Sequence, residues 1–135
     1  MKQAYDYSLD HVRLVRAAVE RCGLSAPVGF AETPLKTLQK IYNGIGPDRW
    51  SSRFRSKVTA LLEWFEPEAL VHDWEYAYQP KTYRHFTLAN VRFAVNCFLA
   101  GYRVVDRRHI CRGLLLALLC QLFGWSGYKN AEVPK

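Results

Sequence analysis

The chain has 135 residues, half of them apolar, and a net charge of +7 from 19 Lys and Arg residues against 12 Asp and Glu residues. This length suits a single domain spanning residues 1–135, and the apolar content excludes a generally disordered chain. The basic balance fits nucleic acid, anionic lipid headgroups or an acidic protein partner, and does not choose among them.

Helical segments are predicted along nearly the whole chain, from capping residues and apolar spacing. Their starts are marked in chain order by Ser8 or Asp10, Thr33-Pro34, Ser51 or Ser52, Pro67, Thr87 and Arg107. Their ends are marked by Gly23, Asn43-Gly44, Phe65, Gln79-Pro80, Gly101 and Gly124. No segment sustains alternation of apolar and polar residues, so the expected fold class is all-α.

The most apolar run, Gly113 to Trp125, is too short to span a bilayer and predicts a buried helix. The first nineteen residues mix charged and apolar side chains and lack the core of a signal peptide. Without a predicted signal peptide or transmembrane segment, we expect a cytoplasmic or virion-associated protein.

Four cysteines and two clusters of basic residues stand out in the sequence. The cysteines, without a CxxC pair, predict buried free thiols in a reducing compartment rather than disulfides or a zinc site: Cys22, Cys97, Cys111 and Cys120. The basic clusters are either solvated helix faces or surfaces for an anionic partner: Arg49, Arg53, Arg55 and Lys57, then Arg103, Arg107, Arg108 and Arg112.

His72 and Asp73 are the first candidate functional residues. Neighbours on a helix point about 100° apart, so the imidazole can handle a proton while the carboxylate holds a cation. The earlier segment Tyr42-Asn43-Gly44-Ile45-Gly46 has alternating glycines, which let successive carbonyls converge on a hard cation such as Ca²⁺. The alternative without a functional role is a histidine at the core boundary beside an exposed aspartate.

Asn90 lies near the start of the next predicted helix, which can run back antiparallel to the helix of His72. Its side-chain oxygen could then reach the imidazole and fix the ring tautomer, as a general base requires.

These motifs together resemble the secreted phospholipase A2 superfamily, most closely its short bacterial and phage-encoded branch. The matching strings are Asn43-Gly44-Ile45-Gly46-Pro47, then Val71-His72-Asp73-Trp74, then Ala89-Asn90 with Phe93, and late in the chain Leu122-Phe123-Gly124-Trp125-Ser126. The resemblance covers about residues 40–128.

The resemblance implies a phospholipase A2-like fold with two central antiparallel helices, a calcium loop before them and flanking helices. It implies calcium-dependent hydrolysis of phospholipid esters at a membrane surface, with His72 as general base. Calcium would be held by Asp73 and the carbonyls of Tyr42, Gly44 and Gly46.

The chain departs from the family where an aspartate should orient the histidine, because Asn90 occupies that position. Family cysteines are also replaced, by Val71 beside the histidine and by Ile45 in the loop. Two function classes follow: a calcium-dependent lipid esterase with His72 and Asn90 at its catalytic site, or a catalytically weak or inactive scaffold. The scaffold would bind an acidic protein, nucleic acid or membrane through its arginine clusters.

Overall fold

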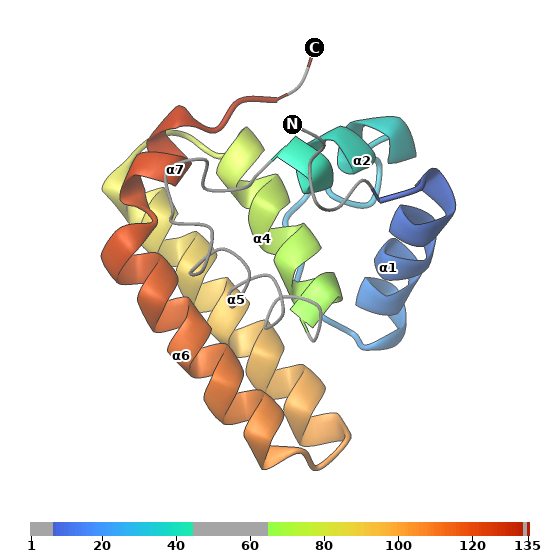
Figure 1. Ribbon diagram of the computed structural model, residues 1–135, viewed down its shortest axis with the longest axis vertical. Helices are drawn as coiled ribbons and strands as arrows, with labels where there is room; N and C mark the ends of the chain where they lie inside the picture. Colours follow the sequence, from blue (N-terminus) through green and yellow to red (C-terminus); the bar gives the residue numbers. More distant parts are fainter. Residues whose placement is uncertain (1–6, 45–64, 134) are drawn as a thin grey trace.

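The computed structural model describes residues 7–44, 65–133 and 135, and every regular element in these ranges is a helix. Figure 1 shows α1 (Leu9–Arg21), α2 (Leu35–Gly44), α4 (Glu66–Tyr78), α5 (Tyr83–Arg103), α6 (Arg107–Phe123) and α7 (Trp125–Asn130). The predicted all-α class is confirmed. In the part of the chain that the structure describes, no helix is long and apolar enough to cross a membrane.

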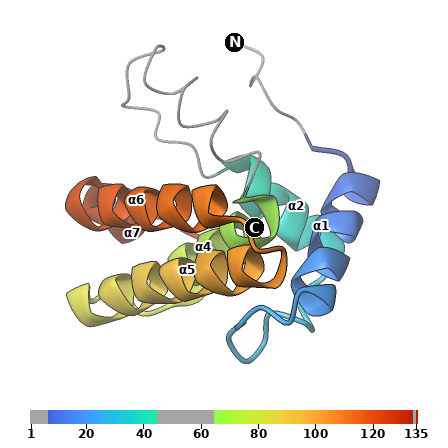
Figure 2. The same ribbon diagram turned by 90° about the horizontal axis from the view of Figure 1, so that it is seen from below.

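The helices α4 and α5 form the expected antiparallel pair. Tyr76, late in α4, contacts Phe86, early in α5, with ring centroids 6.1 Å apart. Phe65, just before α4, lies 6.4 Å from Phe93, further along α5. Helix α6 then runs back along α5, and Figure 2 shows these two long helices side by side with α1 and α2 beyond α4.

Side-chain caps fix three of the helix starts. The hydroxyl of Ser8 accepts a hydrogen bond from the His11 backbone N–H, and that of Thr82 accepts one from His85. The carboxylate of Asp106 accepts bonds from the backbone N–H groups of the second and third residues of α6. Each cap satisfies amide groups that have no partner within the helix.

The predicted limits of α5 were wrong at both ends. The cap is Thr82 rather than Thr87, and the helix continues through Gly101 to Arg103. A side chain at Gly101 would place its Cβ 2.5 Å from Ile110, and one at Gly113 would lie 2.4 Å from the Cβ of Cys97. These glycines therefore allow α5 and α6 to approach closely, and Gly101 does not end its helix.

Three apolar clusters form the core. The first lies among α1, α2 and α4, the second among α4, α5 and α6, and the third where α7 closes over α4 and α5. Helix α7, which the sequence did not predict, contributes the fully buried Tyr128 to the third cluster. The predicted helix 51–65 lies outside the described residues except for Phe65.

Two predictions of burial on α6 were wrong. Four leucines in its apolar run are exposed rather than buried, because only one side of α6 packs on α4 and α5: Leu114, Leu115, Leu118 and Leu122. All four cysteines are free thiols, but only Cys97 is fully buried and Cys111 is exposed.

Candidate functional site

His72 lies on the side of α4 that faces α5, where its residue is 7% exposed. Its ring packs against Tyr76 at 4.1 Å and Phe93 at 5.1 Å between centroids. Its Nε2 lies 2.8 Å from Oδ1 of Asn90, so the predicted contact across the helix pair is present.

The hydrogen bonds of Asn90 determine which nitrogen of His72 carries a proton. The Nδ2 group of Asn90 donates to Oε1 of Gln121 at 2.8 Å, and its Oδ1 accepts from the Tyr76 hydroxyl at 3.0 Å. Because Oδ1 is only an acceptor, Nε2 of His72 must be the donor. In the neutral ring, Nδ1 then holds the lone pair that a general base needs.

Gln121 is in turn held by two hydroxyls of α5. Its Nε2 group donates to Tyr83 and to Thr87, each at 3.1 Å. The amide of Gln121 therefore presents its oxygen toward Asn90, and this arrangement fixes the orientation of the Asn90 amide.

Asp73 approaches the other nitrogen of the imidazole. Its Oδ1 lies 3.7 Å from Nδ1 of His72, and its side chain is 16% exposed. Burial raises the pKa of Asp73, while the hydrogen bond and charge of His72 oppose that rise. A proton on Nδ1 or a cation at the carboxylate would stabilise this arrangement, since two unprotonated acceptors repel each other.

The predicted calcium ligands are only partly described. Asp73 lies on α4, and Tyr42 packs from α2 against two of the core clusters. Tyr42 and Gly44 are helical, and Gly46 lies outside the described residues. Residues two apart in a regular helix lie about 200° apart around its axis, so both carbonyls can reach one ion only where the last turn opens.

The chemical type of the donors at Asp73, which are oxygen atoms, suits calcium. In the described ranges, no group of three or more His, Cys, Asp or Glu side chains could hold a metal. A site built from the Asp73 carboxylate, backbone carbonyls and water would offer oxygen donors, which calcium accepts and softer metals disfavour. Asp73 also lies in a buried setting where a cation would offset the cost of its charge.

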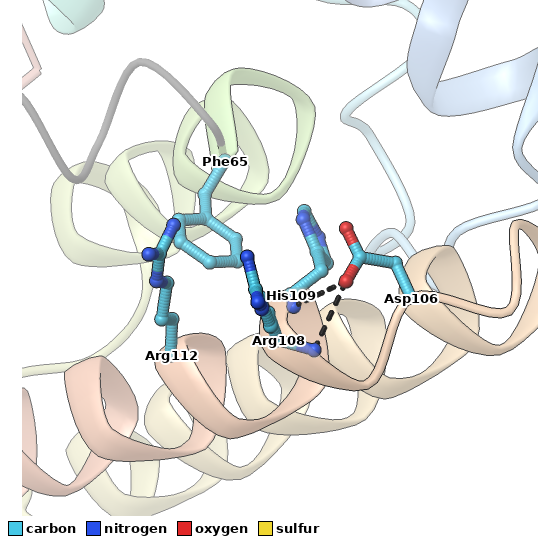
Figure 3. Close-up of a pocket in the computed structure, with 5 residues that line it drawn as sticks. All are labelled: Phe65, Asp106, Arg108, His109 and Arg112. Atoms are coloured by element: carbon cyan, nitrogen blue, oxygen red, sulfur yellow. Dashed lines mark hydrogen bonds between the residues drawn. The ribbon is translucent and has the colours of Figure 1, made fainter.

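A separate cavity of about 260 Å³ lies at the start of α6 (Figure 3). Neither His72 nor Asp73 lines it. The lining residues are Phe65, Asp106, Arg108, His109 and Arg112. Nε2 of the lining residue His109 lies 3.0 Å from the carboxylate of Glu68, which is 2% exposed. The cavity combines cationic side chains with an apolar ring, and it stands apart from the imidazole site.

Sequence reasoning identified His72, Asp73 and Asn90 but missed Gln121. The sequence signal for Gln121 was a single amide in an otherwise apolar stretch of α6. Of the basic clusters, residues 49–57 lie outside the described ranges, and Arg107, Arg108 and Arg112 are exposed on α6. Comparison of the chain with protein-family models, with curated proteins and with solved structures found no match.

Proposed function

We propose that this chain hydrolyses a phospholipid ester in a calcium-dependent reaction, with His72 as general base and Asn90 as its positioning residue. The observation that carries the proposal is the bond from Nε2 of His72 to Asn90, which leaves Nδ1 as the base beside Asp73.

The proton chemistry follows from that tautomer. Nδ1 of His72 takes a proton from a water molecule as the water oxygen attacks the ester carbonyl, and the imidazolium then returns the proton to the leaving alcohol. The carbonyl dipole of Asn90 stabilises the positive ring less than a carboxylate would. The Tyr76 hydroxyl shares the same oxygen and weakens it further as an acceptor. We therefore expect slow turnover.

Asp73, with the carbonyls of Tyr42, Gly44 and Gly46, would hold the calcium ion. When bound, calcium would polarise the ester carbonyl. A site with one carboxylate binds calcium weakly, so millimolar concentrations are the appropriate range for assays.

The test is release of fatty acid from phosphatidylglycerol vesicles with calcium or with a chelator. Wild type should release fatty acid only with calcium, and His72→Gln should not. His85→Gln is the matched control, because Nδ1 of His85 lies 2.7 Å from the hydroxyl of the capping Thr82 at the start of α5, and it should retain wild-type activity. Calcium-independent release, or equal activity in His72→Gln, would overturn the proposal.

Calcium binding is tested separately by thermal shift. Asp73→Asn should lose the calcium-induced rise in melting temperature, while Asp10→Asn, which removes an exposed carboxylate paired with Arg13, should keep it. An unchanged response in Asp73→Asn would remove Asp73 from the ligand set.

The second function class, a scaffold without catalysis, is favoured by two observations. The position that orients His72 holds an amide, whereas arginines are exposed on α6. If wild type fails to hydrolyse lipid, binding to an acidic protein, nucleic acid or a membrane through these arginines is the remaining account.

A further inference from the structure

The outer side of α5 carries a continuous apolar stripe. Its members recur every three or four residues and are 45–69% exposed: Leu88, Val91, Val95, Phe98 and Tyr102. At 100° per residue they fall within an arc of about 80°. Large apolar side chains gathered in this way on a helix mark an interaction surface, unlike single exposed residues.

Helix α6 carries a matching stripe. Its leucines at 114, 115, 118 and 122 are 45–63% exposed, and Cys111 continues the stripe toward the N-terminus of α6. Cys97 and Gly113 meet where the helices touch, and Phe98 and Leu114 directly follow them. Because the two helices are antiparallel, the residue that follows each contact residue points to the same side of the helix pair. Phe98 and Leu114 therefore lie on one side of the pair, and the two stripes continue outward from them; we call the two stripes together the hairpin face.

The turn between the helices extends the apolar surface. Val104 is 71% exposed and Val105 is 85% exposed. Val105 has a φ of 55°, a left-handed conformation that is strained for a β-branched residue. The two valines therefore expose apolar side chains to water at the tip of the hairpin, which is unfavourable.

The charge around the hairpin face has one sign. Helices α5 and α6 contain six arginines and no Asp or Glu, and the only acidic residue between them is the capping Asp106. Of the six, Arg92 pairs with the carboxylate of Glu75 on α4 at 3.1 Å. Arg84 continues the α5 stripe at one end of the face, and Arg107 continues the α6 stripe at the other. Both are exposed.

We propose that the hairpin face docks on an anionic lipid surface. Its leucines, valines and Phe98 would enter the boundary between headgroups and acyl chains, and Arg84 and Arg107 would contact lipid phosphates at the two ends. An anionic bilayer complements this surface, because its acyl chains suit the aliphatic side chains and its phosphates suit Arg84 and Arg107 at the ends.

The charges disfavour a second copy of the chain as the occupant. Pairing two hairpin faces would bring four arginines, Arg84 and Arg107 of each copy, into one interface whose stripes hold no carboxylate. Nucleic acid is disfavoured by side-chain type, since bases stack on aromatic rings and this face is mainly leucine and valine.

The hairpin face lies away from α4, because the α5 residues that pack on α4 point to the other side of the hairpin. Docking therefore does not require His72, and the inference goes beyond the proposed hydrolysis. It can hold even if the chain has no esterase activity.

The test uses co-sedimentation with vesicles, in a His72→Gln background so that hydrolysis cannot alter them. Vesicles of equal parts phosphatidylglycerol and phosphatidylcholine are compared with phosphatidylcholine alone. We expect at least about tenfold stronger binding to the anionic vesicles, weakened by salt. The double variant Val95→Asp/Leu118→Asp should lose at least about tenfold of this binding.

The matched control is Leu14→Asp/Val28→Asp, which places two carboxylates at positions 66% and 100% exposed that belong to neither α5 nor α6. It should bind as the parent does. Circular dichroism checks that all variants fold. Equal binding to both vesicle types, or retained binding in the Val95→Asp/Leu118→Asp variant, would overturn the proposal. So would self-association that this variant abolishes, which would assign the face to a second copy.

Discussion

Asn90 and Gln121 face each other as paired amides, with Nδ2 of Asn90 donating to Oε1 of Gln121 at 2.8 Å. This contact joins α5 to α6 and turns the Asn90 oxygen toward His72. Gln121 touches no part of the imidazole, yet it determines which atom of Asn90 the imidazole meets.

Replacing Gln121 tests this relationship. Gln121→Leu leaves Nδ2 of Asn90 without its acceptor, so we expect a loss of about 1–3 kcal/mol in the free energy of unfolding. The Asn90 amide should then rotate, and hydrolysis should fall further than the stability loss explains. Urea unfolding and fatty-acid release measure the two effects, and an unchanged rate in a folded variant would contradict the positioning role.

The close approach of α5 and α6 at Gly113 gives a second prediction. Gly113→Ala would place a methyl group 2.4 Å from the Cβ of Cys97, and we expect a cost of about 1–3 kcal/mol in unfolding free energy.

Gly127→Ala is the matched control, since nothing lies within 4 Å of its added Cβ in helix α7. It should be neutral or stabilise by up to about 1 kcal/mol, because alanine favours helix. Equal effects of the two changes would show that the helices can separate without cost.

Local patterns predicted the helical class and most of the described helices. Capping residues and apolar spacing gave the all-α class, the limits of α6 and the α4–α5 pair, because these depend on neighbouring residues. The start of α5 was missed because Thr82 and Thr87 are equally good caps in sequence. Thr87 is instead used as an acceptor for Gln121, which is a tertiary contact.

The site was predictable only where residues are close in sequence to His72 or lie on the helix that directly follows its own. His72, Asp73 and Asn90 met that condition, whereas Gln121 comes from α6, 31 residues after Asn90. The exposed leucines of α6 were misjudged for a related reason. Apolar composition predicts burial, but which side of a helix finds a partner depends on the packing of the whole chain.

The buried carboxylate of Glu68 predicts a dependence of stability on pH. Burial raises the pKa of Glu68 above its ordinary value of 4.5, and the hydrogen bond from His109 only opposes that rise. A raised carboxyl pKa stabilises the fold at low pH, and this contribution is lost as pH rises from 4.5 through the folded pKa.

The free energy of unfolding of the wild type should therefore fall between pH 4.5 and 7.5 as Glu68 ionises. Glu68→Gln cannot ionise at this position, so its free energy of unfolding should fall less. Urea unfolding at the two pH values measures the difference. Glu132→Gln removes an exposed carboxylate and should follow wild type. The same pH dependence in Glu68→Gln and wild type would be inconsistent with a raised pKa.

Thiol reactivity should separate the cysteines of the α5–α6 hairpin. Burial, with a smaller effect of the Asp73 charge, raises the pKa of Cys120 to about 12, and burial also raises that of Cys97. At pH 8 we expect iodoacetamide to modify the exposed Cys111 first, with Cys97 and Cys120 reacting only after unfolding. Mass spectrometry of the native protein checks this order. Early modification of Cys97 would show that the contact between α5 and α6 opens readily.

The most direct measurement is calcium-dependent fatty-acid release by Asn90→Asp beside wild type. A carboxylate at this position can stabilise the charged imidazole, and Gln121 can turn its NH₂ group toward it, so activity should rise by at least about tenfold. Adding His72→Gln should abolish the gain, which shows that it acts through the imidazole. If neither wild type nor Asn90→Asp releases fatty acid at saturating calcium, His72 is not the base of a lipid esterase.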